Sequence, residues 1–133
     1  MSNAADRLRG RSDFDRWLSA AFAEIGSFTA LVVLVDIAGT KVTPVRSTFM
    51  NIIGDETYWA EVAGLLQSAG VAWNGVSFFP VTGIEGGPLD NDAARSRLRE
   101  LQERLAEDRL VLNEGHFFDE WGRRLKIEEV PEA

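Results

Sequence analysis

The stretch Phe28-Thr-Ala-Leu-Val-Val-Leu-Val-Asp-Ile37 decides the fold of this chain. Its six consecutive apolar residues, from Ala30 to Val35, leave no polar face, which is typical of a strand buried on both sides. We therefore expect residues 28–37 to form a central strand of a sheet. The rest of the chain must then supply shorter strands to flank it and amphipathic helices to cover it.

Length and composition indicate one domain. The chain has 133 residues, of which 45% are hydrophobic, so it can bury one core and has no room for a second. We expect a single domain over residues 1–133, with 1–11 as a flexible arm and 131–133 as a tail. The formal net charge of −7 repels phosphate backbones, so nucleic acid is not an expected partner.

The absence of cysteine excludes disulfides and thiolate chemistry and points to a reducing compartment. The apolar run is too short to cross a bilayer, and the first residues lack the apolar stretch of a signal peptide. We therefore expect a cytoplasmic protein that has no membrane association.

Three segments have the apolar spacing of amphipathic helices. The first follows Ser12, a good N-cap with Asp15 three residues later, and is expected to end at Gly26. The second is expected to run from Asp55, its N-cap, to residue 69, and the third begins near Asp90. The apolar stripe of the second helix is Tyr58, Val62, Leu65, Leu66 and Ala69, and that of the third is Ala94, Leu98, Leu101 and Leu105. On the third, Glu100 and Arg104 have the i, i+4 spacing of an ion pair.

The remaining segments predict strands. Residues 38–40 provide a turn, and residues 41–49 return as a strand that Pro44 places at a sheet edge or at a bulge. Residues 71–81 predict a strand that Gly75 bends and Pro80 ends early. From Leu110 to Ile127 we expect two or three short antiparallel strands. The fold class is α+β, a mainly antiparallel sheet with three amphipathic helices packed on it, grouped over one face.

The hairpin segment Asp36-Ile-Ala-Gly-Thr-Lys41 resembles the first phosphate-binding hairpin of sugar kinases of the ROK type, in the actin-like ATPase superfamily. The resemblance covers these six residues and implies phosphate binding through Gly39, Thr40 and Lys41 and metal binding through Asp36. Such kinases are much longer, and no second phosphate loop follows here. The alternative is a simple hairpin turn, in which Asp, Gly and Thr are favoured for backbone reasons.

Two other segments are candidates for a small-molecule site. The loop Gly83-Ile-Glu-Gly-Gly87 could approach a ligand closely, although it matches no nucleotide-binding motif. His116 is the only histidine, so any imidazole catalysis must use it. In an extended segment Asp119 would lie on the opposite face from His116, so closeness in sequence does not make a catalytic dyad. No metal-ligand spacing is present, and we expect neither a metal nor a cofactor.

Aromatic residues are numerous, with four Trp and eight Phe. A candidate protein-binding surface combines some of them with acidic residues: Trp73, Phe117, Phe118, Asp119, Glu120 and Trp121. Such a surface suits a basic partner protein or a second copy of the chain. The alternative is that these aromatic side chains complete the core under the third helix.

The sequence therefore favours a small, acidic, protein-binding domain of the adaptor or inhibitor type, which binds a basic partner or forms a homodimer and catalyses nothing. The competing hypothesis is a small-molecule or nucleotide-binding enzyme domain. That domain would use the hairpin of residues 36–41, the loop of residues 83–87, or His116.

Overall fold

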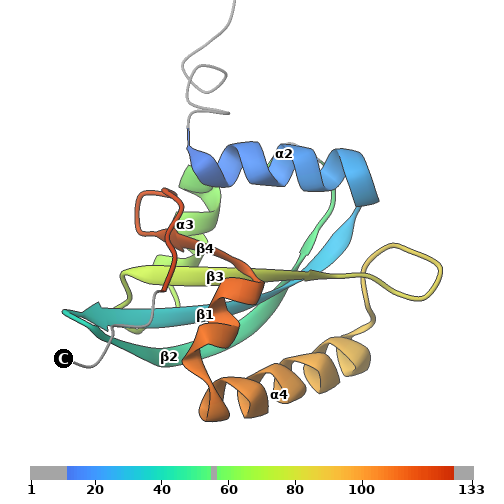
Figure 1. Ribbon diagram of the computed structural model, residues 1–133. Helices are drawn as coiled ribbons and strands as arrows, with labels where there is room; N and C mark the ends of the chain where they lie inside the picture. The colour runs from blue at the N-terminus through green and yellow to red at the C-terminus, as the bar shows by residue number, and fades with distance from the viewer. Residues whose placement is uncertain (1–11, 55–56, 128–133) are drawn as a thin grey trace, which may run out of the picture.

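The structure is a computed structural model that describes residues 12–54 and 57–127. The expected arm 1–11, the expected cap Asp55 and the tail 131–133 lie outside these residues. Figure 1 shows one sheet with helices above and below it. The elements in chain order are α2 (Asp13–Ile25), β1 (Phe28–Ala38), β2 (Lys41–Ile52), α3 (Trp59–Gln67), β3 (Gly75–Val81), α4 (Asn91–Glu107), the 3₁₀ helix η1 (Arg109–Glu114) and β4 (His116–Asp119).

The four strands form one antiparallel sheet in the order β2-β1-β3-β4, which confirms the α+β class and the central position of β1. β1 pairs along its whole length with β2, from Phe28 opposite Ile52 to Ala38 opposite Lys41. On its other side it pairs with β3, from Thr29 opposite Val81 to Val35 opposite Gly75. Its first eight residues are all buried, as the unbroken apolar run predicts.

The helices lie on both faces of the sheet, so the expectation that they group over one face is wrong. On one face α2 and α3 pack on Phe28, Ala30, Val32 and Leu34 of β1, and on the other α4 and η1 pack on Leu31, Val33 and Val35. Figure 1 shows α2 and α3 above the strands and α4 below them. A strand with side chains buried in both directions requires this cover, because period-two alternation sends successive residues to opposite faces.

The first helix follows its sequence signals, with one exception. The Ser12 side chain accepts a hydrogen bond from the Asp15 N–H at 3.0 Å, and Gly26 ends the helix with a φ of 72°. Asp15, expected to complete a capping box, instead accepts a bond from the backbone N–H of Trp59 at the start of α3. Its carboxylate therefore links the two helices.

The second helix is shorter than expected. α3 begins at Trp59, and its N-cap Tyr58 makes no side-chain cap hydrogen bond. Val62 and Leu66 face the core, but Leu65, expected on the same stripe, is 63% exposed. Trp59, which is not on that stripe, is buried.

The strand boundaries differ from the expected ones at three places. β2 ends at Ile52 and not at the expected residue 49. It is an edge strand with a bulge next to Pro44, so both expectations for that proline hold. β3 begins at Gly75 and continues through Pro80, which lies beyond the last residue that β4 pairs with. In the tail, the segment with Leu110 and Leu112 is the 3₁₀ helix η1, and between residues 120 and 127 β4 is followed by an isolated bridge of Phe118 with Arg124 instead of a further strand.

The third helix is confirmed in position and in its inner face, with Ala94, Leu101 and Leu105 buried. Asp90 caps it by accepting a bond from the Ala93 N–H at 2.8 Å. The expected Glu100–Arg104 pair is absent from the ion pairs found among the described residues. Arg104 instead binds both carboxylate oxygens of Glu114 at 2.7 Å, because η1 brings Glu114 beside it. In the described part of the chain, no helix is long and apolar enough to span a bilayer.

Candidate functional site

The aromatic and acidic segment after η1 divides between core and surface. Phe117 and Phe118 are both buried, Phe117 against the α4 face of the sheet and Phe118 against the α2 face. Phe117 is a core residue under the third helix, as the alternative interpretation has it, whereas Phe118 is a core residue on the opposite face, and neither is available to a partner. Trp73 is half-buried and packs edge-on to Trp59, with ring centroids 6.4 Å apart. The exposed aromatic residue of the segment is Trp121, at 61%.

Trp121 lies on a turn that Asp119 holds in place. Oδ1 of Asp119 accepts hydrogen bonds from the N–H groups of Trp121 and Arg123, each at 2.9 Å, and Oδ2 accepts one from Nε of Arg123 at 2.7 Å. The backbone closes the turn as well, because Gly122 N–H donates to the Asp119 carbonyl and Asp119 N–H donates to the Arg123 carbonyl. The guanidinium of Arg123 lies 4.7 Å from the centroid of the Trp121 ring.

The same turn is fixed to the body of the domain. The carbonyl of Gly122 accepts a bond from the Phe14 N–H at 3.0 Å, and the indole N–H of Trp59 donates to the Glu120 carbonyl at 3.2 Å. A side chain at Gly122 would meet the Trp59 ring at 2.9 Å, so only glycine allows the turn to lie this close to α3. The turn therefore presents Trp121 to solvent from a rigid base.

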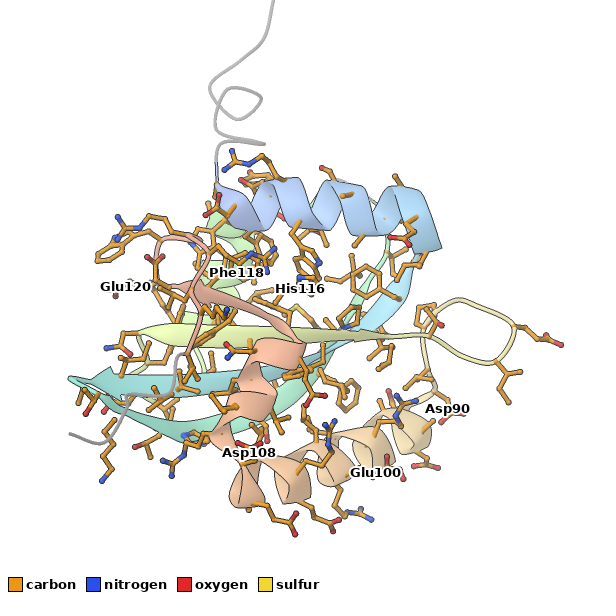
Figure 2. The ribbon with its side chains drawn as sticks, viewed as in Figure 1. Asp90, Glu100, Asp108, His116, Phe118 and Glu120 are labelled. Atoms are coloured by element: carbon orange, nitrogen blue, oxygen red, sulfur yellow. The ribbon has the colours of Figure 1, made fainter. Side chains whose placement is uncertain are left out.

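His116 sits at the start of β4 beneath α2 (Figure 2). Its ring stacks on Trp17, with centroids 4.6 Å apart and an interplanar angle of 25°. Nδ1 lies 3.0 Å from a guanidinium nitrogen of Arg124, and because arginine can only donate, Nδ1 is the acceptor and the ring is neutral. Burial, and then the charge of Arg124, lower the pKa of His116.

The carboxylates near His116 in sequence do not pair with it. Glu114 is bound by Arg104 and Asp119 by Arg123, while Glu120 is exposed at the far end of the segment. The partner that the fold supplies is Arg124, a cation, which is also anchored by its backbone N–H to Asp13 at 2.7 Å. An imidazole held neutral by an arginine lacks the acid or base partner of a catalytic dyad.

The hairpin that resembles a phosphate-binding loop is the exposed turn between β1 and β2. Asp36, Thr40 and Lys41 are exposed, and Gly39 has the positive φ of 62° that the turn needs. The backbone of Ile37 next to it is already occupied, because the Asn74 side chain accepts from its N–H at 2.7 Å and donates to its carbonyl at 3.0 Å.

The loop of residues 83–87 lies at the other end of the sheet (Figure 1). Its hydrogen bonds close on themselves, from Gly83 N–H to the Gly87 carbonyl and from Gly86 N–H to the Gly83 carbonyl, and Ile84 at its tip is fully exposed. The hairpin follows Val35 on β1, whereas the loop follows Val81, which pairs with Thr29 six residues away. At about 3.3 Å per residue, roughly 20 Å of strand separates the two. The hairpin and the loop therefore do not form one site.

Four hollows in the described surface complete the candidate sites. The smallest of them, about 220 Å³, adjoins the hairpin turn and is lined by Ile37, Gly39, Thr40, Val42, Phe117, Leu125, Lys126 and Ile127. The largest, about 520 Å³, lies between β2 and α4 and is lined by Thr43, Pro44, Val45, Arg46, Ser47, Gln102, Ala106 and Arg109 over a floor of Val33 and Leu105. A second of about 330 Å³ and a third of about 270 Å³ lie on opposite sides of Pro80 and His116. Among the described residues no three His, Asp or Glu side chains are placed to hold a metal ion.

Comparison of the chain with protein-family models, with curated proteins and with solved structures finds no match in any of the three. The kinase resemblance of residues 36–41 gains no support from them. The function must therefore be argued from the surface itself.

Two features of that surface were not found from the sequence. The groove between β2 and α4 is formed by residues more than fifty positions apart, so no local sequence pattern predicts it. The Arg124 contact of His116 depends on the chain reversing at Gly122, whose only sequence signal is the glycine itself.

Proposed function

We propose that this chain is a protein-binding domain without catalytic activity, and that Trp121 is the anchor of its contact. One observation carries the proposal: a tryptophan 61% exposed on a turn that Asp119 and Gly122 hold rigid. Tryptophan and arginine are enriched among residues that dominate binding energy, and here Arg123 stacks on Trp121. A preordered anchor avoids the entropic cost of fixing a loop on binding.

The partner we propose is a basic protein. The net charge of −7 attracts a positively charged surface over distance and speeds encounter with it. The same charge makes two copies of this chain repel each other, which weighs against the homodimer expected as the alternative. At the turn itself Glu120 is an exposed carboxylate, whereas Asp119 is neutralised by Arg123.

The experiment compares immobilised wild-type protein with Trp121→Ala and with Ile84→Ala in capture from an extract of the source cells. Ile84 is a matched control because it is an apolar residue on a distant loop and is even more exposed than Trp121. We expect a basic protein that wild type and Ile84→Ala retain and that Trp121→Ala binds about thirtyfold more weakly, the loss typical of a hot spot. Equal retention by all three proteins would show that Trp121 is not the anchor.

Two further measurements separate the competing functions. Light scattering at rising concentration tests the homodimer, which predicts a mass that doubles for wild type and not for Trp121→Ala. A thermal shift with ATP and Mg²⁺ that disappears in Asp36→Ala would instead favour the nucleotide-binding hypothesis. We expect neither change.

A further inference from the structure

The two edges of the sheet differ in how they are covered. Beyond β4 the chain folds back, so that Asp119 N–H donates to the Arg123 carbonyl and Leu125 N–H donates to the Phe117 carbonyl. Beyond β2, at the opposite edge, no described residue forms a strand partner. One edge is thus closed by the protein itself, and the other offers a strand of twelve residues with one side unpaired.

The open edge is only partly protected against pairing. Pro44 lacks an N–H, and the bulge beside it interrupts the register between β1 and the start of β2. From Ser47 to Ile52 the register is regular, without proline, bulge or charged side chain. This half of β2 therefore has no proline, bulge or charged side chain that would prevent an added strand.

The flank of α4 beside β2 is basic. Helical spacing places four residues of α4 on one stripe next to the buried one: Arg95, Arg99, Gln102 and Ala106, at steps of four, three and four. Arg109, the first residue of η1, lines the same groove as Gln102 and Ala106. Gln102 donates a hydrogen bond to Ser47 of β2, which fixes this flank against the edge strand. At the start of α4, Asp92 lies on the same stripe and pairs with Arg95 at 3.6 Å, whereas no Asp or Glu lies on it from Arg99 to Ala106.

The groove between β2 and α4 is positively charged, like the flank of the helix. Its lining includes Arg46 and Arg109 and no carboxylate. Arg46 donates to the Ala69 carbonyl, and Arg109 makes no ion pair with any residue in the described part of the chain. In a chain with a net charge of −7, an acid-free groove beside an open strand edge is a local reversal of the overall field.

We propose that this edge binds an extended, acidic segment of another protein, which adds to the sheet as a fifth strand along β2. Backbone hydrogen bonds to β2 supply affinity that is independent of sequence, and alternate side chains of the segment point toward α4. Carboxylates at those positions meet Arg99 and Arg109. The surface lies at the sheet edge opposite Trp121, so it is separate from the anchor proposed above and can succeed or fail independently.

The test uses a fluorescein-labelled peptide of four Glu-Val repeats, with fluorescence anisotropy to measure binding. A peptide of four Glu-Pro repeats has the same charge but too few N–H donors to pair as a strand, and a peptide of four Lys-Val repeats reverses the charge. We expect binding of the Glu-Val peptide alone. Equal binding of the Glu-Pro peptide would show that the surface attracts acidic peptides by charge alone, without strand addition. No binding of the Glu-Val peptide would overturn the proposal.

Variants locate the site. Arg99→Ala and Arg109→Ala should each weaken binding of the Glu-Val peptide by roughly twofold to fivefold, which is the range expected for loss of one exposed ion pair. Arg97→Ala is the matched control, since it removes the same charge from the opposite flank of α4, and it should have a smaller effect. Trp121→Ala should bind this peptide like wild type. If Arg97→Ala weakens binding as much as Arg109→Ala, the groove is not the site.

Hydrogen exchange of the β2 amides identifies the added strand directly. In an edge strand about half of the amides pair with the neighbour, and the others point outward and exchange quickly. The Glu-Val peptide should protect the outward set between Ser47 and Ile52. Protection confined to other elements would contradict strand addition. Protection that rises with protein concentration in the absence of peptide would assign the edge to a second copy of this chain instead.

Discussion

The carboxylate of Asp15 accepts a hydrogen bond from the backbone N–H of Trp59 at 2.8 Å. Asp15 is on α2 and Trp59 is the first residue of α3, so one side chain caps the second helix from the first. Asp15 is only 5% exposed, which makes this bond a buried one. The arrangement fixes the position of Trp59, and Trp59 in turn supports the turn that carries Trp121.

Asp15→Ala should lower the free energy of unfolding by about 1.5 to 3 kcal/mol, because it leaves the buried N–H of Trp59 without its charged acceptor. Asp15→Asn keeps an acceptor oxygen and should recover about half of the loss. Urea denaturation measures both variants. Asp92→Ala is the control, since Asp92 is exposed in the first turn of α4, and a loss as large as that of Asp15→Ala would show that the buried bond is unimportant.

Gly122→Ala should destabilise the protein by about 2 to 4 kcal/mol. Its φ of 78° is unfavourable for alanine, and the added carbon would meet the Trp59 ring at 2.9 Å. Gly64→Ala should instead raise the free energy of unfolding, because Gly64 is exposed in α3 and no atom lies near the position that an added Cβ would take. That variant should gain about 0.5 to 1 kcal/mol. Thermal and urea denaturation of the two alanine variants, compared with wild type, test both signs.

The central strand could be predicted from residues 28–37 because a strand that is apolar on both faces must be buried on both faces, and few positions in a fold other than the middle of a sheet allow this. The same run also implied helices on both faces, and the expectation of a single covered face ignored that consequence. The strand predicted around Leu110 failed for a different reason. Asp108 caps the Leu110 N–H at 2.9 Å and starts a 3₁₀ turn, and this turn buries Val111 and Leu112 together instead of alternating them.

The surface residues could be predicted only in part. Residues 117–121 were a plausible patch in sequence, but β4 is covered on both faces, which buries Phe117 and Phe118 and leaves Trp121 as the exposed aromatic residue. The basic flank of α4 was present in the sequence and was missed. Its arginines are mixed with glutamates in the sequence, and only the position of β2 distinguishes Arg109, which lines the groove, from the other arginines.

Asn74→Ala should lower the free energy of unfolding by about 1 to 3 kcal/mol, because the Asn74 side chain makes two hydrogen bonds to the backbone of Ile37. Asn74→Asp should lose at least as much, since it keeps the acceptor but places a carboxylate oxygen against the Ile37 carbonyl. Urea denaturation is the measurement. Asp36→Ala, one residue away and exposed, should stay within about 0.5 kcal/mol of wild type.

The neutral state of His116 makes stability depend on pH. Burial and the neighbouring Arg124 lower the pKa of His116 below its ordinary value of 6.5 in the folded protein, so the unfolded chain takes up its proton first as the pH falls. The free energy of unfolding should therefore decrease as the pH drops below about 6.5 and level off below the folded-state pKa. Urea denaturation of wild type between pH 7.5 and 5 measures this slope. His116→Phe keeps an aromatic ring against Trp17 but cannot titrate, so its slope over the same interval should be smaller. Equal slopes for wild type and His116→Phe over this interval would show that the pKa of His116 is not lowered on folding, contrary to its burial and its contact with Arg124.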